Sequence, residues 1–252
     1  MRRFLLLILL LFPGLANGEE TIVADLSQRH VSITTNFNGS EILIFGAVRR
    51  EGPRIDEPLD VIITVAGPPS PITVRKKDRV AGIWVNTDQA ELDSAPSFYA
   101  MLSTGNLDEI ISATEDLRHR ITTPQLIRAV DVGATEGTEN FVDALIRIRE
   151  EEGAYQRRDN SVGIIDETLF RATVELPANL TEGDYDTTMY LVRNGEVVNK
   201  FATSIDVQKV GLERFLFSLA HNQPLVYGLM SLAIAIAAGW LASAAFTVML
   251  RR

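Results

Sequence analysis

The chain of 252 residues contains no cysteine. This absence excludes disulfide bonds, thiolate catalysis, thiolate metal ligands and lipid attachment through a cysteine. Histidine is almost as scarce, since His30, His119 and His221 are the only three. None of them has a second ligand at a recognised metal-binding spacing, so the sequence predicts no metal site and no cofactor.

Motifs for a chemical reaction are also missing, and no Gly-x-Ser-x-Gly nucleophile motif occurs. Glu182, Asp184 and Asp186 alternate along one segment as paired catalytic carboxylates could. At a turn-to-strand junction, however, surface charges are the simpler interpretation. The acidic segment 131–139 lacks the ligand pattern of a calcium loop, so we interpret it as a solvated connector. We therefore predict that the protein is not an enzyme and has no catalytic residues.

Charge is absent from one long stretch, the 26 residues Leu225–Leu250. As a helix this stretch is long enough to cross the ~30 Å hydrocarbon core of a membrane. We expect a transmembrane helix in the lipid bilayer at 224–250. A juxtamembrane segment at 211–223 would precede it, and a cytoplasmic tail at 251–252 would follow.

A second apolar stretch lies near the start of the chain. Two arginines precede the nine apolar residues Phe4–Phe12, which are too few to span a membrane, and Pro13-Gly14 follows. This pattern is typical of a signal peptide, expected at 1–18. With the late helix and the Arg251-Arg252 pair behind it, it predicts a single-pass type I protein with its body outside the cytoplasm.

Basic residues are in the minority between these two ends. Without the four terminal arginines, 20 basic and 33 acidic residues remain, a net charge of −13. A body with this charge is not expected to bind nucleic acid or anionic lipid headgroups. The basic cluster Arg75–Arg79 is a local exception. It could attract an inorganic anion, or it could be an exposed hairpin end.

The body, residues 19–210, has strand patterns in its first and last thirds. Short β-branched runs predict strands at 21–26, 31–35, 41–48, 61–66, 72–75, 80–86, 169–176, 186–193 and 196–207. Asn38-Gly39 and Asn194-Gly195 are expected to form turns. Tyr185 follows a Gly turn, as in the tyrosine corner of immunoglobulin-like sandwiches, although an ordinary strand Tyr is the alternative. We expect a mainly β, immunoglobulin-like β-sandwich.

Helical spacing interrupts the strands at about 96–153. Apolar residues predict one helix at 107–118, with Asn106 as its N-cap, and a second helix at 139–151. We interpret this part as a helical insertion within a single sandwich domain.

Within the expected membrane helix, small residues recur at every fourth position: Ser231, Ala235, Gly239 and Ser243. Such a stripe permits another helix to approach closely. Chance is a serious alternative, because 11 of the 26 residues are Gly, Ala or Ser. We treat the four residues as helix-packing candidates. The partner would be a multi-pass membrane protein or a second copy of the chain.

Several short motifs run through nearly the whole chain that remains after residue 18. They are Phe37-Asn38-Gly39, Ile44-Phe45-Gly46-Ala47, Gly82-Ile83-Trp84-Val85-Asn86, Pro96-Ser97-Phe98-Tyr99, Thr168-Leu169-Phe170-Arg171, Gly183-x-Tyr185 and Tyr227-Gly228-Leu229. In these motifs the chain resembles a family of transmembrane proteins of alphaproteobacteria. The resemblance implies a periplasmic β-rich domain on a single helix in the bacterial inner (plasma) membrane. It also implies a link between the family and sulfite or sulfonate exporters. It assigns a catalytic role to no residue of this chain.

These observations predict a non-enzymatic accessory or interaction subunit of a membrane transporter. The alternative is a membrane-tethered periplasmic hydrolase or solute-binding domain. A deep polar pocket that holds two carboxylates about 5–10 Å apart would favour that alternative.

Overall fold

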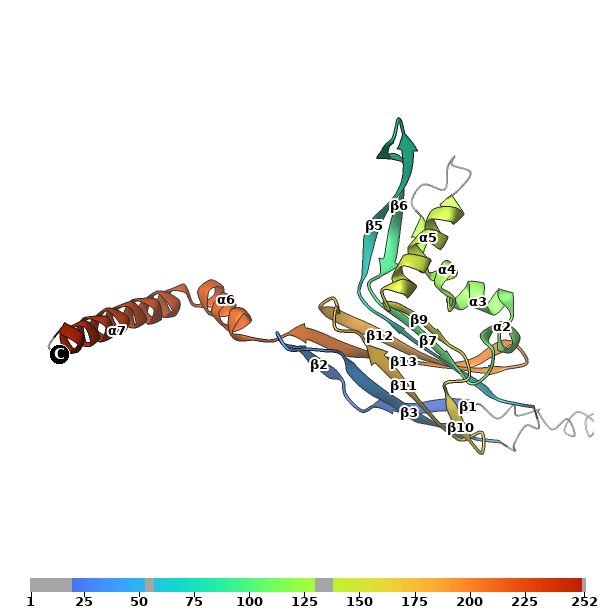
Figure 1. The fold of residues 1–252 in the computed structure, drawn as a ribbon. Helices are drawn as coiled ribbons and strands as arrows, with labels where there is room; N and C mark the ends of the chain where they lie inside the picture. Colours follow the sequence, from blue (N-terminus) through green and yellow to red (C-terminus); the bar gives the residue numbers. More distant parts are fainter. Residues whose placement is uncertain (1–19, 53–56, 130–137, 251–252) are drawn as a thin grey trace, which may run out of the picture. The chain divides into compact units, whose positions relative to one another are not determined.

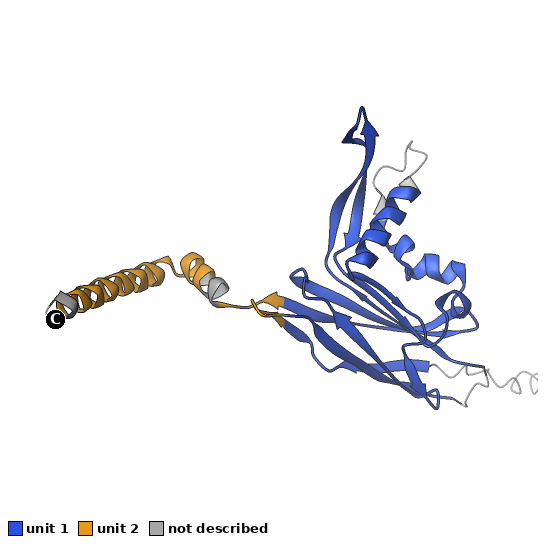
Figure 2. Cartoon of the chain, viewed as in Figure 1, with its two compact units in different colours: residues 1–31, 38–207 blue, residues 32–37, 208–252 orange. Residues whose placement is uncertain are grey.

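The computed structural model describes residues 20–52, 57–129 and 138–250 (Figure 1). The signal peptide expected at 1–18, most of the acidic segment 131–139 and the tail 251–252 lie outside these described residues. The chain forms two compact units (Figure 2). The first unit comprises residues 1–31 and 38–207, and the second comprises 32–37 and 208–252.

The chain is mainly β, as predicted. The strands are β1 (Glu20–Leu26), β2 (His30–Ile33), β3 (Ser40–Arg50), β4 (Asp60–Ala66), β5 (Pro69–Val80), β6 (Ile83–Pro96), β7 (Tyr99–Ser103), β8 (Arg128–Ala129), β9 (Tyr155–Arg158), β10 (Gly163–Ile165), β11 (Leu169–Leu176), β12 (Gly183–Arg193) and β13 (Glu196–Lys209). The helices are α2 (Leu107–Ile110), α3 (Ala113–His119), α4 (Thr123–Leu126), α5 (Thr138–Glu151), α6 (Leu212–Asn222) and α7 (Pro224–Leu250).

The strands form three sheets. Their orders are β1-β3-β11-β10, β2-β13-β12-β4-β7-β9 and β5-β6-β8. Strand β7 pairs with β9 in parallel. The immunoglobulin-like sandwich is not confirmed, because a parallel pair and a third sheet depart from its two antiparallel sheets. Strand β7 also places part of the expected helical insertion inside the six-stranded sheet.

The six-stranded sheet is covered on both faces. In β4, Val61 and Ile63 point to one face and Ile62 to the other, and all three are fully buried. Ile62 joins a cluster that includes Tyr99 and the α5 residue Leu145. Figure 1 shows the helices α2–α5 on one side of this sheet and the four-stranded sheet on the other. Because both faces are buried, β4 is a continuous apolar run in the sequence.

Most strands of the first and last thirds agree with the prediction. β1, β3, β4 and β11 lie where expected, and β12 and β13 form the predicted hairpin. At its turn, Asn194 and Gly195 have φ angles of 51° and 81°. Both central residues of a two-residue type I′ hairpin turn need positive φ. Asn and Gly adopt it readily, so an Asn-Gly pair strongly predicts such a hairpin.

Strands β5 and β6 form one long hairpin, which we call the arm. The strand predicted at 72–75 lies within β5, whereas the strand predicted at 80–86 is wrong at its start, because it crosses the turn at Ala81-Gly82. The arm is paired from Pro69 opposite Pro96 to Val80 opposite Ile83. Figure 1 shows the arm extending away from the sheets, and α5 contacts its strands. The predicted strands were shorter than β5 and β6 because most side chains near the end of the arm are exposed on both faces. The sequence therefore has no alternation of apolar and polar residues there.

The helix predicted at 107–118 is wrong, because the structure has two helices there, α2 and α3. Ile111 between them is extended, with φ −128° and ψ 138°. Ser112 then starts α3, since its side chain accepts a hydrogen bond from the Glu115 N–H at 3.4 Å. The predicted N-cap is confirmed, because the Asn106 side chain accepts from the Asp108 N–H at 3.3 Å.

The second unit contains α6 and α7, which contact each other. Helix α7 coincides with the helix expected at 224–250 and begins at Pro224, a residue that suits the first position of a helix. Its span Pro224–Thr247 has a mean hydropathy of 2.0, and none of its described side chains is buried. Its length and composition suit a membrane crossing.

Candidate functional site

The four helix-packing candidates lie in α7. Ser231, Ala235, Gly239 and Ser243 are all exposed, and their spacing of four residues places them on one face of the helix. A Cβ added at Gly239 would meet no atom within 4 Å. Within the second unit, nothing therefore packs on this face at Gly239.

The histidines and carboxylates singled out in the sequence are dispersed. His30 Nδ1 lies 3.2 Å from Asp206 Oδ2, and His119 Nε2 lies 3.3 Å from Glu115 Oε2. Within residues 20–52, 57–129 and 138–250, no three His, Asp or Glu side chains form a metal-binding group. Glu182, Asp184 and Asp186 are exposed at the start of β12, where Asp184 and Asp186 flank the buried Tyr185, as expected of surface charges.

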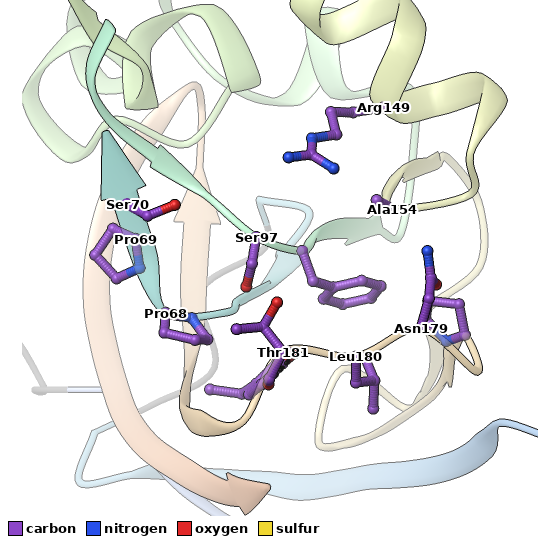
Figure 3. Close-up of a pocket in the computed structure, with 12 residues that line it drawn as sticks. Pro68, Pro69, Ser70, Ser97, Arg149, Ala154, Asn179, Leu180 and Thr181 are labelled. Atoms are coloured by element: carbon purple, nitrogen blue, oxygen red, sulfur yellow. Dashed lines mark hydrogen bonds between the residues drawn. The ribbon is translucent and has the colours of Figure 1, made fainter. Parts of the chain in front are cut away.

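A cavity of about 190 Å³ lies between α5, the start of β5, the β6–β7 connection and the segment before β12 (Figure 3). Its apolar wall includes three prolines and Phe98. Its polar wall consists of Arg149, Ser70, Ser97, Asn179 and Thr181. These residues come from four separate segments, which the fold of the first unit brings together.

Arg149 is the one charged residue among the described residues that line the cavity. Its Nη1 donates to Glu152 Oε2 at 3.0 Å, whereas its Nε is buried and has no hydrogen-bond partner. The Ser97 Oγ is also buried, and a hydrogen bond with it lowers the pKa of the Tyr185 hydroxyl.

Tyr185 is a further residue of the cavity wall. Its hydroxyl donates to the Thr181 carbonyl oxygen at 2.9 Å, four residues upstream, as the Tyr hydroxyl of a tyrosine corner does. Its ring lies 6.0 Å from that of Phe98. Burial raises the pKa of the Tyr185 hydroxyl, although the nearby Ser97 side chain and the hydrogen bond with Thr181 oppose this effect.

Replacing Tyr185 by Phe should lower the free energy of unfolding by about 0.5–1.5 kcal/mol, because it removes this one hydrogen bond and leaves the ring in place. Denaturant unfolding of the full chain in mild detergent measures the change. Thr181→Ala is the matched control, since the bond uses the backbone of Thr181, and we expect it to stay within about 0.5 kcal/mol. Equal stability of Tyr185→Phe and wild type would show that the hydroxyl has no stabilising role.

The end of the arm carries three exposed apolar side chains, Val80, Ile83 and Trp84, which we call the arm tip. They are 52%, 65% and 70% exposed. Arg79 lies opposite Trp84 in the hairpin, and the whole basic cluster Arg75–Arg79 is exposed beside the tip. Packing inside the protein does not explain Trp84, so the arm tip is a candidate contact surface.

A second apolar surface lies on the four-stranded sheet, and we call it the outer apolar face. Val23, Phe45, Ile165 and Leu169 are each 43–57% exposed there. They line a shallow groove of about 520 Å³. Contiguous apolar side chains of this kind mark contact sites more often than scattered single ones.

Sequence reasoning found the stripe in α7 but missed the cavity and both apolar surfaces. The cavity residues Ser70, Ser97, Arg149 and Thr181 are far apart in the chain, and no spacing rule links them. The arm tip did leave a signal, because Ile83 and Trp84 directly follow the Gly82 of a two-residue turn, where polar residues are usual.

Comparisons with known proteins place this geometry in context. Residues 21–248 match the model of the family described as "Putative transmembrane protein (Alph_Pro_TM)". No curated protein matches the chain. Among solved structures, the sporulation control protein Spo0M of Bacillus subtilis matches with 10% identity and a TM-score of 0.29, over 81% of this chain. The match spans 56% of Spo0M, and similarity at this level does not establish a shared fold.

Proposed function

The chain belongs to this family of transmembrane proteins, and on that premise we propose that it is a single-pass type I protein of the bacterial inner membrane. Its β-rich domain would lie in the periplasm, and the end of α7 would face the cytoplasm. We propose that it acts without catalysis, as an accessory or interaction subunit of a multi-pass transporter. A sulfite or sulfonate exporter is the candidate that the family resemblance suggests.

The observation that carries this proposal is the exposed helix α7. None of the described side chains in its span Pro224–Thr247 is buried, which supports cover by lipid or by another membrane protein. The stripe of Ser231, Ala235, Gly239 and Ser243 would let a partner helix approach closely on one face. Packing of this kind is a main source of helix association in membranes, where burial of apolar surface contributes little.

The surfaces of the β-rich domain support an interaction role as well. The arm tip and the outer apolar face both expose apolar side chains that the described chain does not cover. A partner with periplasmic loops could bind at either surface while its helices contact α7.

A hydrolase with paired carboxylates gains no support from the cavity. The described residues of its wall include no Asp or Glu. Its volume of about 190 Å³ is also below the ~300 Å³ typical of sites for larger organic ligands. The interaction role is therefore the better explanation of the surfaces that the structure exposes.

Gly239→Leu tests the role of the helix. The Leu side chain adds bulk on the small-residue stripe without making α7 less apolar, so insertion should survive while close packing is blocked. After native-membrane extraction in mild detergent, we expect recovery of copurifying membrane proteins, identified by mass spectrometry, to fall by about tenfold or more. That fall corresponds to a loss of at least ~1.4 kcal/mol of association free energy.

Ala237→Leu is the matched control, because Ala237 is exposed two residues away, off the stripe. It should leave copurification unchanged. If both variants keep the same partners and the same oligomeric state, α7 is only a tether. The same conclusion would follow if an unrelated leucine-rich anchor could replace the helix without loss of association.

A further inference from the structure

The arm tip combines apolar and basic side chains at the end of one hairpin. Val80 lies opposite Ile83 in the last pair of the hairpin, and Trp84 lies opposite Arg79 in the pair before it. Opposite residues of an antiparallel pair share a face, and successive residues of a strand alternate between faces. Trp84 therefore shares one face with Arg79 and Lys77, while Val80 and Ile83 lie on the other. The end of the arm is apolar on both faces, with basic side chains directly behind it.

The arm tip is also convex. Figure 1 shows the arm extending away from the sheets. A Cβ added at Gly82, in the turn of the hairpin, would meet no atom within 4 Å. A protein partner would need a pocket that matches the protruding Trp84. The interface of a lipid bilayer accepts apolar side chains from a protruding segment without any preformed pocket, so it is the simpler partner for this shape.

The local charge of the arm suits an anionic surface. Between Arg75 and Gln89 there are four basic and two acidic residues, although the body as a whole is acidic. In solvent, charges that lie more than about 8 Å apart are largely screened at physiological ionic strength. The charge near the tip, rather than the net charge of the body, therefore decides which surface the tip attracts.

We propose that the arm tip is a second membrane contact, which inserts into the headgroup region of a bilayer that contains anionic phospholipids. Trp is enriched at this depth because its ring is largely apolar and its N–H can reach water. Lys77 and Arg79 would extend along the apolar side chains and place their charges at lipid phosphates. This assignment leaves the outer apolar face as the surface for a protein partner.

The bilayer that we propose is the one that holds α7. A membrane helix in the same chain keeps the β-rich domain tethered to that bilayer, which raises the effective concentration of its headgroups around the arm. A weak contact at the tip is then sufficient. This choice of bilayer rests on the proposed function, in which α7 spans the membrane.

The two tryptophans of the chain, Trp84 and Trp240, allow both contacts to be measured separately. Trp240→Phe leaves Trp84 as the only reporter of the arm tip, and Trp84→Phe leaves Trp240 as the only reporter of α7. Each full-length variant is placed in phosphatidylcholine vesicles, with or without phosphatidylglycerol and with or without bromine on the acyl chains near the headgroup. We expect brominated lipid to quench Trp84 and its emission to shift to the blue, more strongly when phosphatidylglycerol is present.

Lys77→Gln/Arg79→Gln in the Trp240→Phe chain tests the role of charge. Each Lys or Arg near an anionic membrane contributes about fivefold in affinity, so the ratio of lipid-bound to free arm tip should fall about tenfold or more. Arg171→Gln/Lys200→Gln is the matched control, because it removes the same charge from exposed positions on β11 and β13. The control should quench like the unmodified Trp240→Phe chain.

The two reporters distinguish failure of this proposal from failure of the proposed function. Quenching of Trp240 without quenching of Trp84 overturns the arm contact and leaves α7 in the membrane. Quenching of Trp84 alone supports the arm contact but overturns the assignment of α7. Quenching of Trp84 that disappears when the vesicles are diluted would show contact with a different vesicle, and it would overturn the choice of bilayer.

Three further results would overturn the proposal. The first is a blue shift of Trp84 without quenching by brominated lipid, which would show that protein, such as a second copy of the chain, covers the tip. The second is equal quenching of Trp84 with and without phosphatidylglycerol. The third is quenching in Lys77→Gln/Arg79→Gln that equals quenching in the matched control.

Discussion

Replacing Glu20 by Gln is expected to lower the free energy of unfolding by about 3–5 kcal/mol. The Glu20 side chain is only 6% exposed, and its carboxylate accepts hydrogen bonds from Arg50 Nε at 2.8 Å and from Arg193 Nη2 at 2.9 Å. Arg193 is itself only 7% exposed. Without the carboxylate its charge would remain buried and uncompensated, and this accounts for the size of the effect.

The cluster also joins two sheets. Glu20 and Arg50 lie in the neighbouring strands β1 and β3 of the four-stranded sheet, whereas Arg193 belongs to β12 of the six-stranded sheet. Arg193 further donates to the Glu57 carbonyl oxygen, and Arg50 donates to that of Glu167. Loss of the carboxylate would therefore loosen a connection between the sheets as well as a single ion pair.

The same cluster predicts a dependence of stability on pH. Burial alone would raise the pKa of Glu20, but hydrogen bonds from Arg50 and Arg193, together with their charges, outweigh burial and lower it below its ordinary value of 4.5. A group with a lowered pKa in the folded state contributes its stability above the unfolded-state pKa and loses it as the pH falls through the folded-state pKa. The difference between wild type and Glu20→Gln should thus be full at pH 7 and shrink below about pH 4.5.

Denaturant unfolding of the full chain in mild detergent, followed at neutral and acidic pH, measures both effects. The matched control is Glu91→Gln, which removes an exposed carboxylate on β6 and should change stability by less than about 0.5 kcal/mol. The double variant Glu20→Gln/Arg193→Met should lose less than the sum of its single variants, because no charge is left uncompensated at position 193. A Glu20→Gln protein as stable as the Glu91→Gln control would refute the role of the cluster.

The parts of the fold that the sequence predicts well are those with one buried and one exposed face. In β11, buried Phe170 and Val174 alternate with exposed Leu169 and Arg171, so the period of two is visible. The arm has no buried face near its end, and β7 is buried on both faces, so neither has this period. The break between α2 and α3 was missed because Ser112 is compatible with a helix interior by spacing alone, and only its cap contact shows that a new helix begins.

The candidate sites were harder to predict than the fold, for a physical reason. The stripe in α7 is local, since every fourth residue of one helix shares a face, and it can be recognised in the sequence. The cavity depends on tertiary packing that brings the end of α5 over the β6–β7 connection. Only that packing places Arg149 in the wall of the cavity, whereas Arg147 on the same helix is exposed.

A reporter enzyme that is active only outside the cytoplasm should be active when fused after Val207 and silent when fused after Arg252. Val207 ends the first compact unit, so this fusion carries the β-rich domain without α7. The reporter after Arg252 would follow the membrane helix and remain in the cytoplasm, where the Arg251-Arg252 pair is favoured by the excess of positive charge on that side. The contrast should be close to all-or-none, because each fused reporter lies on one side of the membrane or on the other.

A fusion after Val207 that lacks residues 1–18 is the matched control, and it should be silent because export depends on that segment. A second reporter that is active only in the cytoplasm should give the reverse pattern, which guards against poor expression of one fusion. Activity after Arg252 together with silence after Val207 would reverse the proposed orientation. In that case the β-rich domain, with its arm tip and its outer apolar face, would face cytoplasmic partners, and the transporter loops proposed to bind it would have to lie on that side.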